Sequence, residues 1–142
     1  DVYKRQEVRI ALDSSVLIAA NISRAGTCAE LLEDLLLHHE LVISEFILEE
    51  LNRKLIEKFH FPLREADQVV SFLRRVGTVV EPVDLPADLC RDPEDIPILG
   101  TAVAGECGRL ISVDRDRPDM HTIQDIPIVR PVEFWRRTSE EM

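Results

Sequence analysis

The chain has 142 residues, of which 45% are hydrophobic and 31% are charged, so it has the size and composition of one globular domain rather than of a disordered or fibrous protein. No apolar run reaches the roughly 18 residues that a membrane-spanning helix needs, and we expect no membrane segment. The net charge of −10 argues against a nucleic-acid binder with a broad basic surface, but it suits a protein that gathers carboxylates around cations.

The first six residues differ in character from the rest of the chain. The polar hexapeptide Asp1 to Gln6 is what the end of a common transposon sequencing adapter would encode, so we interpret it as a non-native leader. We expect a single domain over residues 7–138, followed by a short tail over residues 139–142.

The cysteines give an expectation about the compartment. There are three, which is an odd number, and none is in a C-x-x-C spacing: Cys28, Cys90 and Cys107. This pattern predicts small buried thiols in a reducing cytoplasm, rather than a disulfide framework or a thiolate zinc site.

The first part of the sequence predicts one strand and two helices. Val8 to Leu12 (VRIAL) is a nearly continuous apolar run that ends at Asp13, as expected for a strand buried on both faces. Ser14 to Ala20 predicts a short helix. A longer helix is expected from Thr27 to about His38, because T-C-A-E fits a capping box and apolar residues recur behind it.

The middle of the sequence predicts two strands with a pair of helices between them. The strands are expected at Leu41 to Ile43 and at Thr78 to Glu81. Ser44 can cap a helix that has apolar residues on one face and that Pro62 would stop. A second amphipathic helix is expected from about Arg64 to Val76.

The last part begins with an acidic connection that contains prolines. It leads into a helix expected from Asp95 to Glu106, with Pro97 in the first turn. Arg109 to Val113 (RLISV) predicts a fourth strand, which ends at Asp114. A polar loop is then expected to lead to a short fifth strand and a closing helix, at Ile128 to Val129 and near Val132 to Arg137.

This alternation of strands and helices predicts a three-layer α/β/α fold with a mainly parallel sheet and right-handed crossovers. In such sheets the ligand site lies off the carboxyl ends of the strands. The first predicted strand ends in Asp13 and the fourth ends in Asp114, so both carboxylates are expected at that edge. Each residue alone could equally be an N-cap or a turn residue.

Further acids lie on the predicted helices. Asp92 is interpreted as an N-cap or turn acceptor, and Asp95 lies at a helix start, where the backbone dipole favours an anion. Glu50 borders the buried face of its helix, whereas Glu49 lies about 100° around the helix and is expected to face solvent. A half-buried glutamate needs a partner, and a cation is a suitable one.

With these motifs in place, the sequence resembles the PIN-domain family. The resemblance rests on four motifs in register: L-D-S-S-V-L-I from Leu12 to Ile18, S-x5-E-L from Ser44 to Leu51, D-P-E-D-x3-L-x2-A from Asp92 to Ala102, and S-V-D-R-D from Ser112 to Asp116. It covers essentially all of residues 8–135. The chain is similar in particular to the PIN proteins that are the toxins of bacterial and archaeal toxin–antitoxin pairs.

The resemblance implies a four- or five-stranded parallel sheet between helices and a metal-dependent endoribonuclease that uses Mg²⁺ or Mn²⁺ to cut RNA. It also implies an antitoxin partner, and it leaves a homodimer open. Carried over residue by residue, it gives four catalytic, metal-binding acids, one accessory acid that also binds metal and one hydrogen-bonding hydroxyl: Asp13, Glu50, Asp95 and Asp114, then Asp116, then Ser14. Asp92 is an accessory residue of the same region.

The sequence also departs from the family pattern. Ser15 stands where Asn is common, Val113 stands where Gly or Arg is usual, and Arg117-Pro118 replaces an apolar pair. These departures remove no metal ligand, but they bear on substrate preference and on the shape of the last loop. No histidine lies in the motifs, which disfavours a histidine general acid, and carboxylate oxygens suit Mg²⁺ and Mn²⁺.

Basic residues near the motifs are candidates for contacts with RNA phosphates. Arg115 follows Asp114 directly and is the expected phosphate contact. Arg53, Lys54 and Lys58 follow Glu50 along its helix, where a solvated, salt-bridging face is the alternative.

Other α/β classes lack residues that their chemistry requires. A phosphatase of the haloacid dehalogenase type needs D-x-D at the end of the first strand, where this chain has Ser15 at the third position. A receiver domain needs a lysine near its last strands, and residues 109–116 contain none. No G-x-x-x-x-G-K-[ST] loop is present, which excludes a P-loop nucleotide triphosphatase. The remaining alternative is a catalytically inert PIN-like module that binds in a protein or RNA complex.

Overall fold

The computed structural model describes residues 8–90, 92–113 and 122–134. In this part of the chain six strands form one sheet, in the order β3-β2-β1-β4-β6-β5. Five of these strands run parallel to one another, and β5 runs antiparallel to its neighbour β6. The strands are β1 (Arg9–Leu12), β2 (Glu40–Ile43), β3 (Thr78–Val79), β4 (Arg109–Ile111), β5 (Thr122–Ile123) and β6 (Ile126–Val129). The predicted α/β fold with a mainly parallel sheet is therefore confirmed. The sheet has six strands among the described residues, where four or five were expected.

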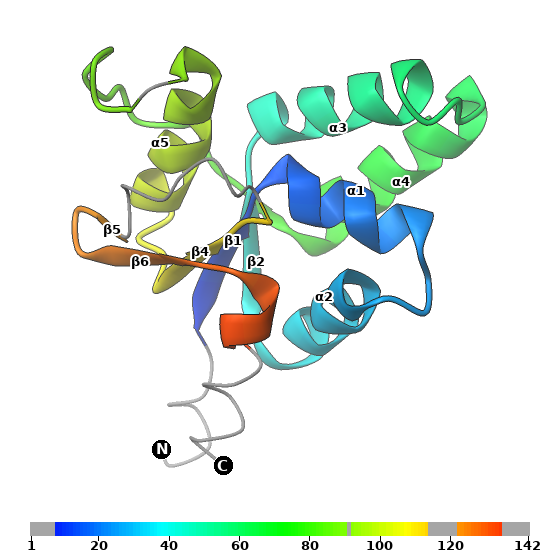
Figure 1. The fold of residues 1–142 in the computed structure, drawn as a ribbon, viewed down its shortest axis with the longest axis horizontal. Coiled ribbons are helices and arrows are strands. Elements are labelled where there is room, and N and C mark those ends of the chain that lie inside the picture. The colour runs from blue at the N-terminus through cyan, green and yellow to red at the C-terminus, as the bar shows by residue number, and fades with distance from the viewer. Residues whose placement is uncertain (1–7, 91, 114–121, 135–142) are drawn as a thin grey trace.

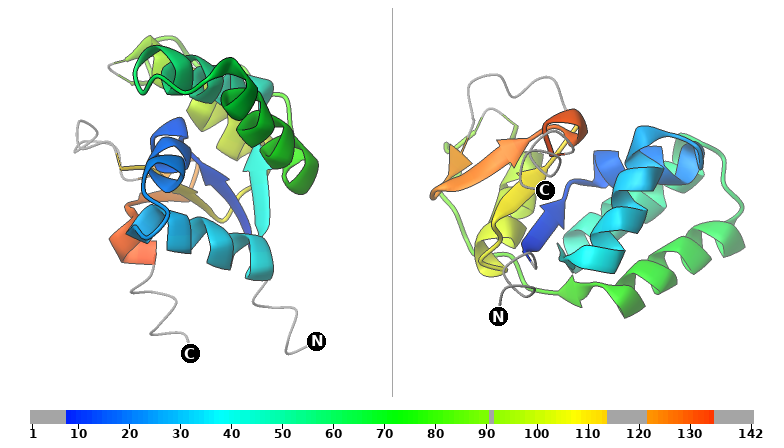
Figure 2. Two further views of the ribbon diagram at one scale, coloured as in Figure 1. Left: turned by 90° about the vertical axis from the view of Figure 1, so that its right-hand side faces the viewer. Right: turned by 90° about the horizontal axis from the view of Figure 1, so that it is seen from below.

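Helices lie on both faces of the sheet (Figure 1). On one face α1 (Ser14–Ile22) contacts β1, α2 (Thr27–His38) contacts β2, and the two helices pack together. On the other face α5 (Ile96–Ala104) contacts β1, β2 and β4 (Figure 2). This follows from the strand order, because the chain moves from β1 to β3 in one direction and returns past β1 to reach β4.

A helical hairpin occupies the space beside these layers. It consists of α3 (Glu45–Glu57) and α4 (Leu63–Val76), joined by the short turn that contains Pro62, and α3 contacts both α1 and α5. Because α3 starts where β2 ends, the first turns of this helix lie at the carboxyl edge of the sheet. The hairpin therefore brings a third helix to the edge where the site is expected.

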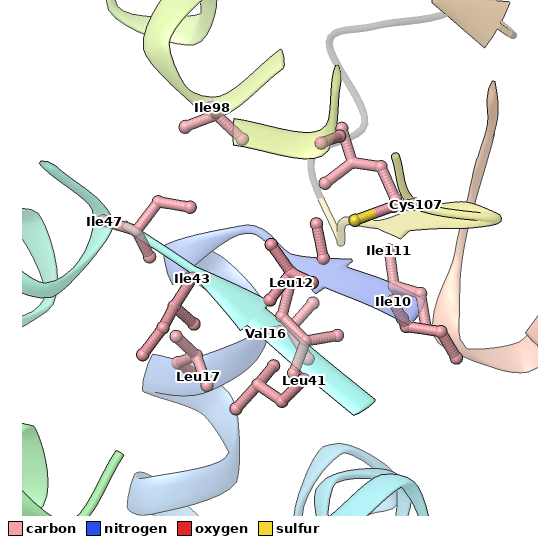
Figure 3. Packing of buried hydrophobic residues seen from close by; sticks show 14 of the residues in the cluster. Ile10, Leu12, Val16, Leu17, Leu41, Ile43, Ile47, Ile98, Cys107 and Ile111 are labelled. Atoms are coloured by element: carbon pink, nitrogen blue, oxygen red, sulfur yellow. The ribbon is translucent and has the colours of Figure 1, made fainter. Parts of the chain in front are cut away.

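The strands are buried because their side chains are apolar on both faces. Ile10, Leu12, Leu41 and Ile43 are fully or almost fully shielded from solvent. Figure 3 shows side chains of β1 and β2 packed with residues of α1, α3 and α5, among them Ile47. Burying each such aliphatic side chain contributes about 1.5–3 kcal/mol to folding, so the core fixes the positions of the strand ends.

The helix starts show one prediction confirmed and one that was wrong. The Ser44 side chain accepts a hydrogen bond from the Ile47 amide (3.4 Å) and caps α3 as expected. The predicted capping box at Thr27 is not formed, because Gly26 is the N-cap of α2 and makes no side-chain cap bond. The Glu30 amide donates to the Gly26 carbonyl (3.2 Å), so the first helical turn closes one residue before Thr27.

The acidic connection before α5 packs closely against that helix at Gly100. A Cβ atom at this position would lie 2.5 Å from the Val83 carbonyl oxygen, and the Val83 amide donates to the Gly100 carbonyl (3.2 Å). Only a glycine allows this approach without displacing the backbone. The contact holds the connection in place before η2 (Pro93–Asp95), the 3₁₀ turn that leads into α5.

The end of the described chain contains the strand that was not predicted. β5 and β6 form a hairpin whose two turn residues, Gln124 and Asp125, have positive φ angles of 46° and 68°. Positive φ at both positions is the geometry of a tight two-residue hairpin turn. The predicted strand at residues 128–129 is part of β6, and residues 131–134 are helical, while the rest of the predicted closing helix lies outside the described residues.

The expectation of buried thiols is confirmed for Cys107 alone. Cys28 and Cys90 are half-buried, and none of the three cysteines forms a disulfide in the part of the chain that the structure describes. Burial raises the pKa of the Cys28 thiol, and it raises that of Cys107 to about 12.

Candidate metal centre

Three buried polar residues from distant parts of the sequence meet at the carboxyl edge of the sheet. Asp13 follows β1, Ser112 follows β4, and Glu50 lies in the second turn of α3. The Asp13 amide donates to the Ile111 carbonyl (3.0 Å), which continues the pairing of β1 with β4 up to the site. The rule that ligands bind at the carboxyl ends of parallel strands is thus met by two adjacent strands of this sheet.

Asp13 is almost fully buried, with 4% of its surface exposed, and both carboxylate oxygens have partners. Oδ1 accepts from the Ser15 amide (3.3 Å), which makes Asp13 the N-cap of α1, and it also lies within 3.3 Å of the Ser14 hydroxyl. Oδ2 accepts a hydrogen bond from the Ser112 hydroxyl (2.8 Å). The N-cap interpretation and the site interpretation of Asp13 are therefore compatible, because the cap fixes one oxygen and Ser112 orients the other.

Glu50 is also buried, with 7% of its surface exposed, while its neighbour Glu49 is exposed as expected. Its Oε1 atom is in contact with the Ser14 hydroxyl and lies 3.6 Å from the Lys54 ammonium. Because the Ser14 hydroxyl has one proton, it can donate to Asp13 or to Glu50 but not fully to both. Ser14 therefore links the two buried carboxylates, in the role that the resemblance implies for it.

The two other predicted acids that the structure describes, Asp92 and Asp95, lie immediately before α5. Asp92 is the N-cap of η2, where its side chain accepts from the Glu94 amide (3.0 Å), so its interpretation as a cap is confirmed. Asp95 is half-buried at the junction of η2 and α5. Since α5 runs from the carboxyl edge back along the sheet, Asp95 lies at the start of a helix that begins on the side of the site.

The described residues do not bring three of the predicted metal ligands together. Within residues 8–90, 92–113 and 122–134, no group of three or more His, Cys, Asp or Glu side chains is placed to hold a metal ion. Asp95 therefore does not form such a group with Asp13 and Glu50. Asp114, Asp116 and Arg115 lie outside the described residues, so their part in the site stays a prediction.

Two features of the site were not singled out from the sequence. Ser112 was part of a motif, but its contact with Asp13 spans 99 positions and could not be inferred from spacing. The Thr101 hydroxyl donates either to the Ser44 hydroxyl (2.8 Å) or to the Pro97 carbonyl (2.7 Å), which ties the start of α3 to the first turns of α5. The sequence signal for Thr101 was a polar residue inside the apolar segment from Ile98 to Ala102, and the structure shows that this residue is buried.

The donor set is suited to a hard divalent cation. Two buried carboxylates contact the same hydroxyl group at a strand end. The atoms that could bind a metal ion here are carboxylate and hydroxyl oxygens rather than thiols or imidazoles. Mg²⁺ is commonly bound by one or two carboxylates and keeps several water molecules, so Asp13 and Glu50 are sufficient to start such a site. Burying the charge of a carboxylate is costly, and a bound cation would lower that cost.

The fold and the site agree with the comparison against known families. The PIN domain family matches residues 9–116, which is most of the chain, and the chain belongs to this family. The matched segment runs from β1 through Asp116 and includes every acid discussed above. No curated protein sequence matches the chain significantly.

Among solved structures, the chain is similar to one chain of the crystal structure of VapBC2 from Rickettsia felis bound to a DNA fragment from their promoter. The sequence identity is 14% and the TM-score is 0.62, and the similarity covers 86% of this chain and 98% of the other. At this identity the likeness supports the fold alone. Separately, no helix among the described residues has the length and apolar character needed to cross a membrane.

Proposed function

We propose that this protein is a metal-dependent endoribonuclease that hydrolyses RNA phosphodiester bonds with Mg²⁺ or Mn²⁺ in the cytoplasm. The observation that carries the proposal is the pair of buried carboxylates, Asp13 and Glu50, joined by the Ser14 hydroxyl at the carboxyl edge of a PIN-domain sheet. In the proposal Asp114 would complete the ligand set together with Asp95, which the described residues do not group with this pair, and Asp116 would be an accessory acid.

When bound, the metal ion supplies a hydroxide at neutral pH and a counter-charge for the phosphate. The protein's own contribution is orientation. Ser112 holds Oδ2 of Asp13, and the α1 cap holds Oδ1, so the direction of this carboxylate is set before any ligand arrives. Ser14 contacts both carboxylates and so orients Asp13 and Glu50, which would hold the cation.

The acidity of the chain limits how the protein would bind the proposed RNA substrate. With a net charge of −10 the protein cannot rely on general attraction for RNA, so the phosphate must be bound locally. A divalent cation at the site provides that local positive charge. Arg115, which directly follows Asp114, is proposed as a phosphate contact beside the cation.

We further propose that the protein is the toxin of a toxin–antitoxin pair. The similarity to a chain of the VapBC2 assembly supports this, together with the family resemblance of the motifs. A basic segment of an antitoxin would find a suitable anion in the pair of buried carboxylates. Co-expression with the products of the flanking genes, followed by affinity purification and sizing, tests the pairing; a chain that purifies without a stoichiometric partner in both cases would contradict it.

The nuclease proposal is tested by incubating the purified protein with mixed RNA substrates in Mn²⁺ and in EDTA. The decisive variants are Asp13→Asn and Glu50→Gln, and Glu49→Gln is the matched control because it removes the same charge from the exposed neighbouring position. We expect cleavage by wild type and Glu49→Gln in Mn²⁺, loss of about 100-fold or more in the two site variants, and no cleavage in EDTA. Equal cleavage by all four proteins would indicate a contaminant and reject the proposal.

The competing function is an inert binding module. This alternative predicts that the wild-type protein binds RNA or a protein partner but shows no cleavage at any Mn²⁺ concentration, and that Glu50→Gln leaves the binding unchanged.

A further inference from the structure

We propose that Lys54 is the intramolecular counter-ion of Glu50, that it yields this carboxylate to the divalent cation, and that the released ammonium then contacts an RNA phosphate. The inference rests on the proposed function, because it names the residue that competes with the metal at the proposed site. The observation that carries it is the ion pair between Lys54 Nζ and Glu50 Oε1 across one turn of α3.

The geometry of the pair is that of a loose and replaceable contact. The two atoms are 3.6 Å apart, which is too long for a good hydrogen bond, and Oε1 is also the atom in contact with the Ser14 hydroxyl. A glutamate four residues before a lysine is favourably arranged on a helix, so the pair forms without a distortion of α3. A divalent cation that binds Oε1 at metal–ligand distance replaces this contact with a stronger one.

The two partners also differ in their surroundings. The Glu50 side chain is 7% exposed, whereas the Lys54 side chain is 38% exposed. The acid is therefore fixed inside the site, while the lysine lies at its rim and can leave without opening the core. Its flexible stem carries a compact ammonium group with three rotatable donors, which suits a move from a carboxylate to a nearby phosphate.

Lys54 has no competing carboxylate in the part of the chain that the structure describes. Lys58, the C-cap of the same helix, lies one turn further along and packs over the Phe59 ring at 5.7 Å. Among the described residues, Glu50 is the acid within ion-pair distance of Lys54. A purely structural salt bridge on an exposed helix face would not need a buried partner, so the pairing with a site residue indicates a role in the site.

Two opposite consequences follow when Lys54 is replaced by an uncharged residue of similar length. Without the ammonium, a divalent cation meets no competitor and no repulsion at Glu50, so the protein should bind Mn²⁺ more tightly. A partly exposed ion pair of this kind corresponds to an affinity gain of about two- to fivefold. RNA should bind less well, because one positive charge near the phosphate is missing. A merely structural role would not raise metal affinity.

The test is isothermal titration of Mn²⁺ into the full chain without RNA, using wild type, Lys54→Met, Lys54→Arg and Lys58→Met. We expect a Kd about two- to fivefold lower for Lys54→Met alone, and a higher KM for RNA with little change in kcat in the same variant. Lys54→Arg keeps the charge and should stay near wild type, and Lys58→Met controls for the loss of charge from the same helix.

Each outcome separates the inference from the proposed function. Wild-type binding of Mn²⁺ with an equal or weaker affinity in Lys54→Met overturns the role of Lys54 and leaves the metal site standing. An equal gain in Lys58→Met also overturns it, because the effect would then be one of overall charge. An unchanged KM rejects the phosphate contact. No Mn²⁺ binding by the wild type overturns the proposed metal site and this inference together.

Discussion

Acids at the two ends of the sheet differ in their burial and in their partners. Near the amino ends of the strands, Glu40 is 42% exposed and forms an ion pair with Arg9 (3.3 Å) as well as a hydrogen bond from the Thr78 hydroxyl (2.7 Å). At the carboxyl ends, Glu50 is buried and has the Ser14 hydroxyl and a loosely placed Lys54 as partners. The partly exposed Glu40 thus has the guanidinium partner, although such a partner would stabilise the buried carboxylate of Glu50 more.

This difference separates the residues that serve the proposed function from those that stabilise the fold. A chain selected for folding alone would pair its buried carboxylate with an arginine or replace it with an apolar residue. Here the hydroxyls of Ser14 and Ser112 contact the carboxylates of Asp13 and Glu50, and the Lys54 ammonium lies 3.6 Å from Glu50. If the proposed function holds, the acids at the carboxyl end of the sheet receive a cation, while the ion pair at the amino end stabilises the fold.

The largest effect is expected when the orientation of Asp13 is disturbed. Ser112→Ala removes the hydroxyl that donates to Oδ2, and loss of such an outer hydrogen bond lowers metal affinity by about 10- to 100-fold. Mn²⁺ titration measures the effect, with Ser71→Ala on the exposed surface of α4 as the control. An unchanged affinity in Ser112→Ala would show that Asp13 does not need this contact.

The next effect concerns the link between α3 and α5. Thr101→Val removes a fully buried hydroxyl that bonds to Ser44 or to the Pro97 carbonyl, while the volume of the side chain is nearly kept. We expect a loss of about 1–3 kcal/mol in the free energy of unfolding, measured by urea denaturation. Thr101→Ser, which restores the hydroxyl, should recover part of this loss. If the serine variant is no more stable than the valine variant, the hydroxyl does not stabilise the fold.

A direct contrast of the two ends uses one glutamate from each. Without metal, Glu40→Gln should destabilise the protein by up to about 1 kcal/mol, because it removes a partly exposed ion pair. Glu50→Gln should stabilise it by a similar amount, about 1 kcal/mol, because it removes a buried charge while keeping an oxygen that can accept from Ser14. Thermal melts in EDTA compare the two. Destabilisation of equal size in both variants would remove the contrast between the two ends.

The smallest effect belongs to an ion pair that lies outside both regions. Arg74 donates to Glu45 through Nε and a second nitrogen (2.8 and 2.9 Å) on the exposed face of the α3–α4 hairpin, and this hydrogen bonding lowers the pKa of Glu45. A lowered folded-state pKa adds stability that is complete above the ordinary carboxyl pKa and is lost as the pH falls through the lowered value. Glu45→Gln should therefore differ slightly from wild type near neutral pH and match it in acid. A difference that grows in acid would have the wrong sign.

Much of the fold could be predicted because its parallel strands are buried on both faces. Runs such as residues 8–12 and 109–113 have few polar interruptions, and each is followed by an acid in the sequence. β5 could not be predicted in the same way, because it has two residues and its turn is Gln124-Asp125 rather than a pair containing glycine or asparagine. The cap of α2 was assigned to Thr27 because its sequence fits, but a turn from Ser23 to Gly26 starts the helix earlier.

Two acids of the candidate site, Asp13 and Glu50, could be predicted to be buried or at a strand end, but two of their contacts could not be predicted. Helical periodicity distinguished the buried Glu50 from the exposed Glu49, and the end of the first strand identified Asp13. The contacts of Ser112 and Lys54 depend on how strands and helices pack and on which rotamer a side chain adopts. Neither is encoded in a short motif, so both required the structure.

The central claim is that the carboxyl end of the sheet binds a divalent cation through Glu50. The most direct measurement compares thermal melts of wild type, Glu50→Gln and Glu49→Gln in EDTA and in Mn²⁺. A ligand at about a hundredfold excess over its Kd stabilises a protein by about 2.7 kcal/mol, so we predict a clear rise in Tm for wild type and Glu49→Gln and little or none for Glu50→Gln. No rise in the wild type, or the same rise in all three proteins, would contradict a cation site at Glu50.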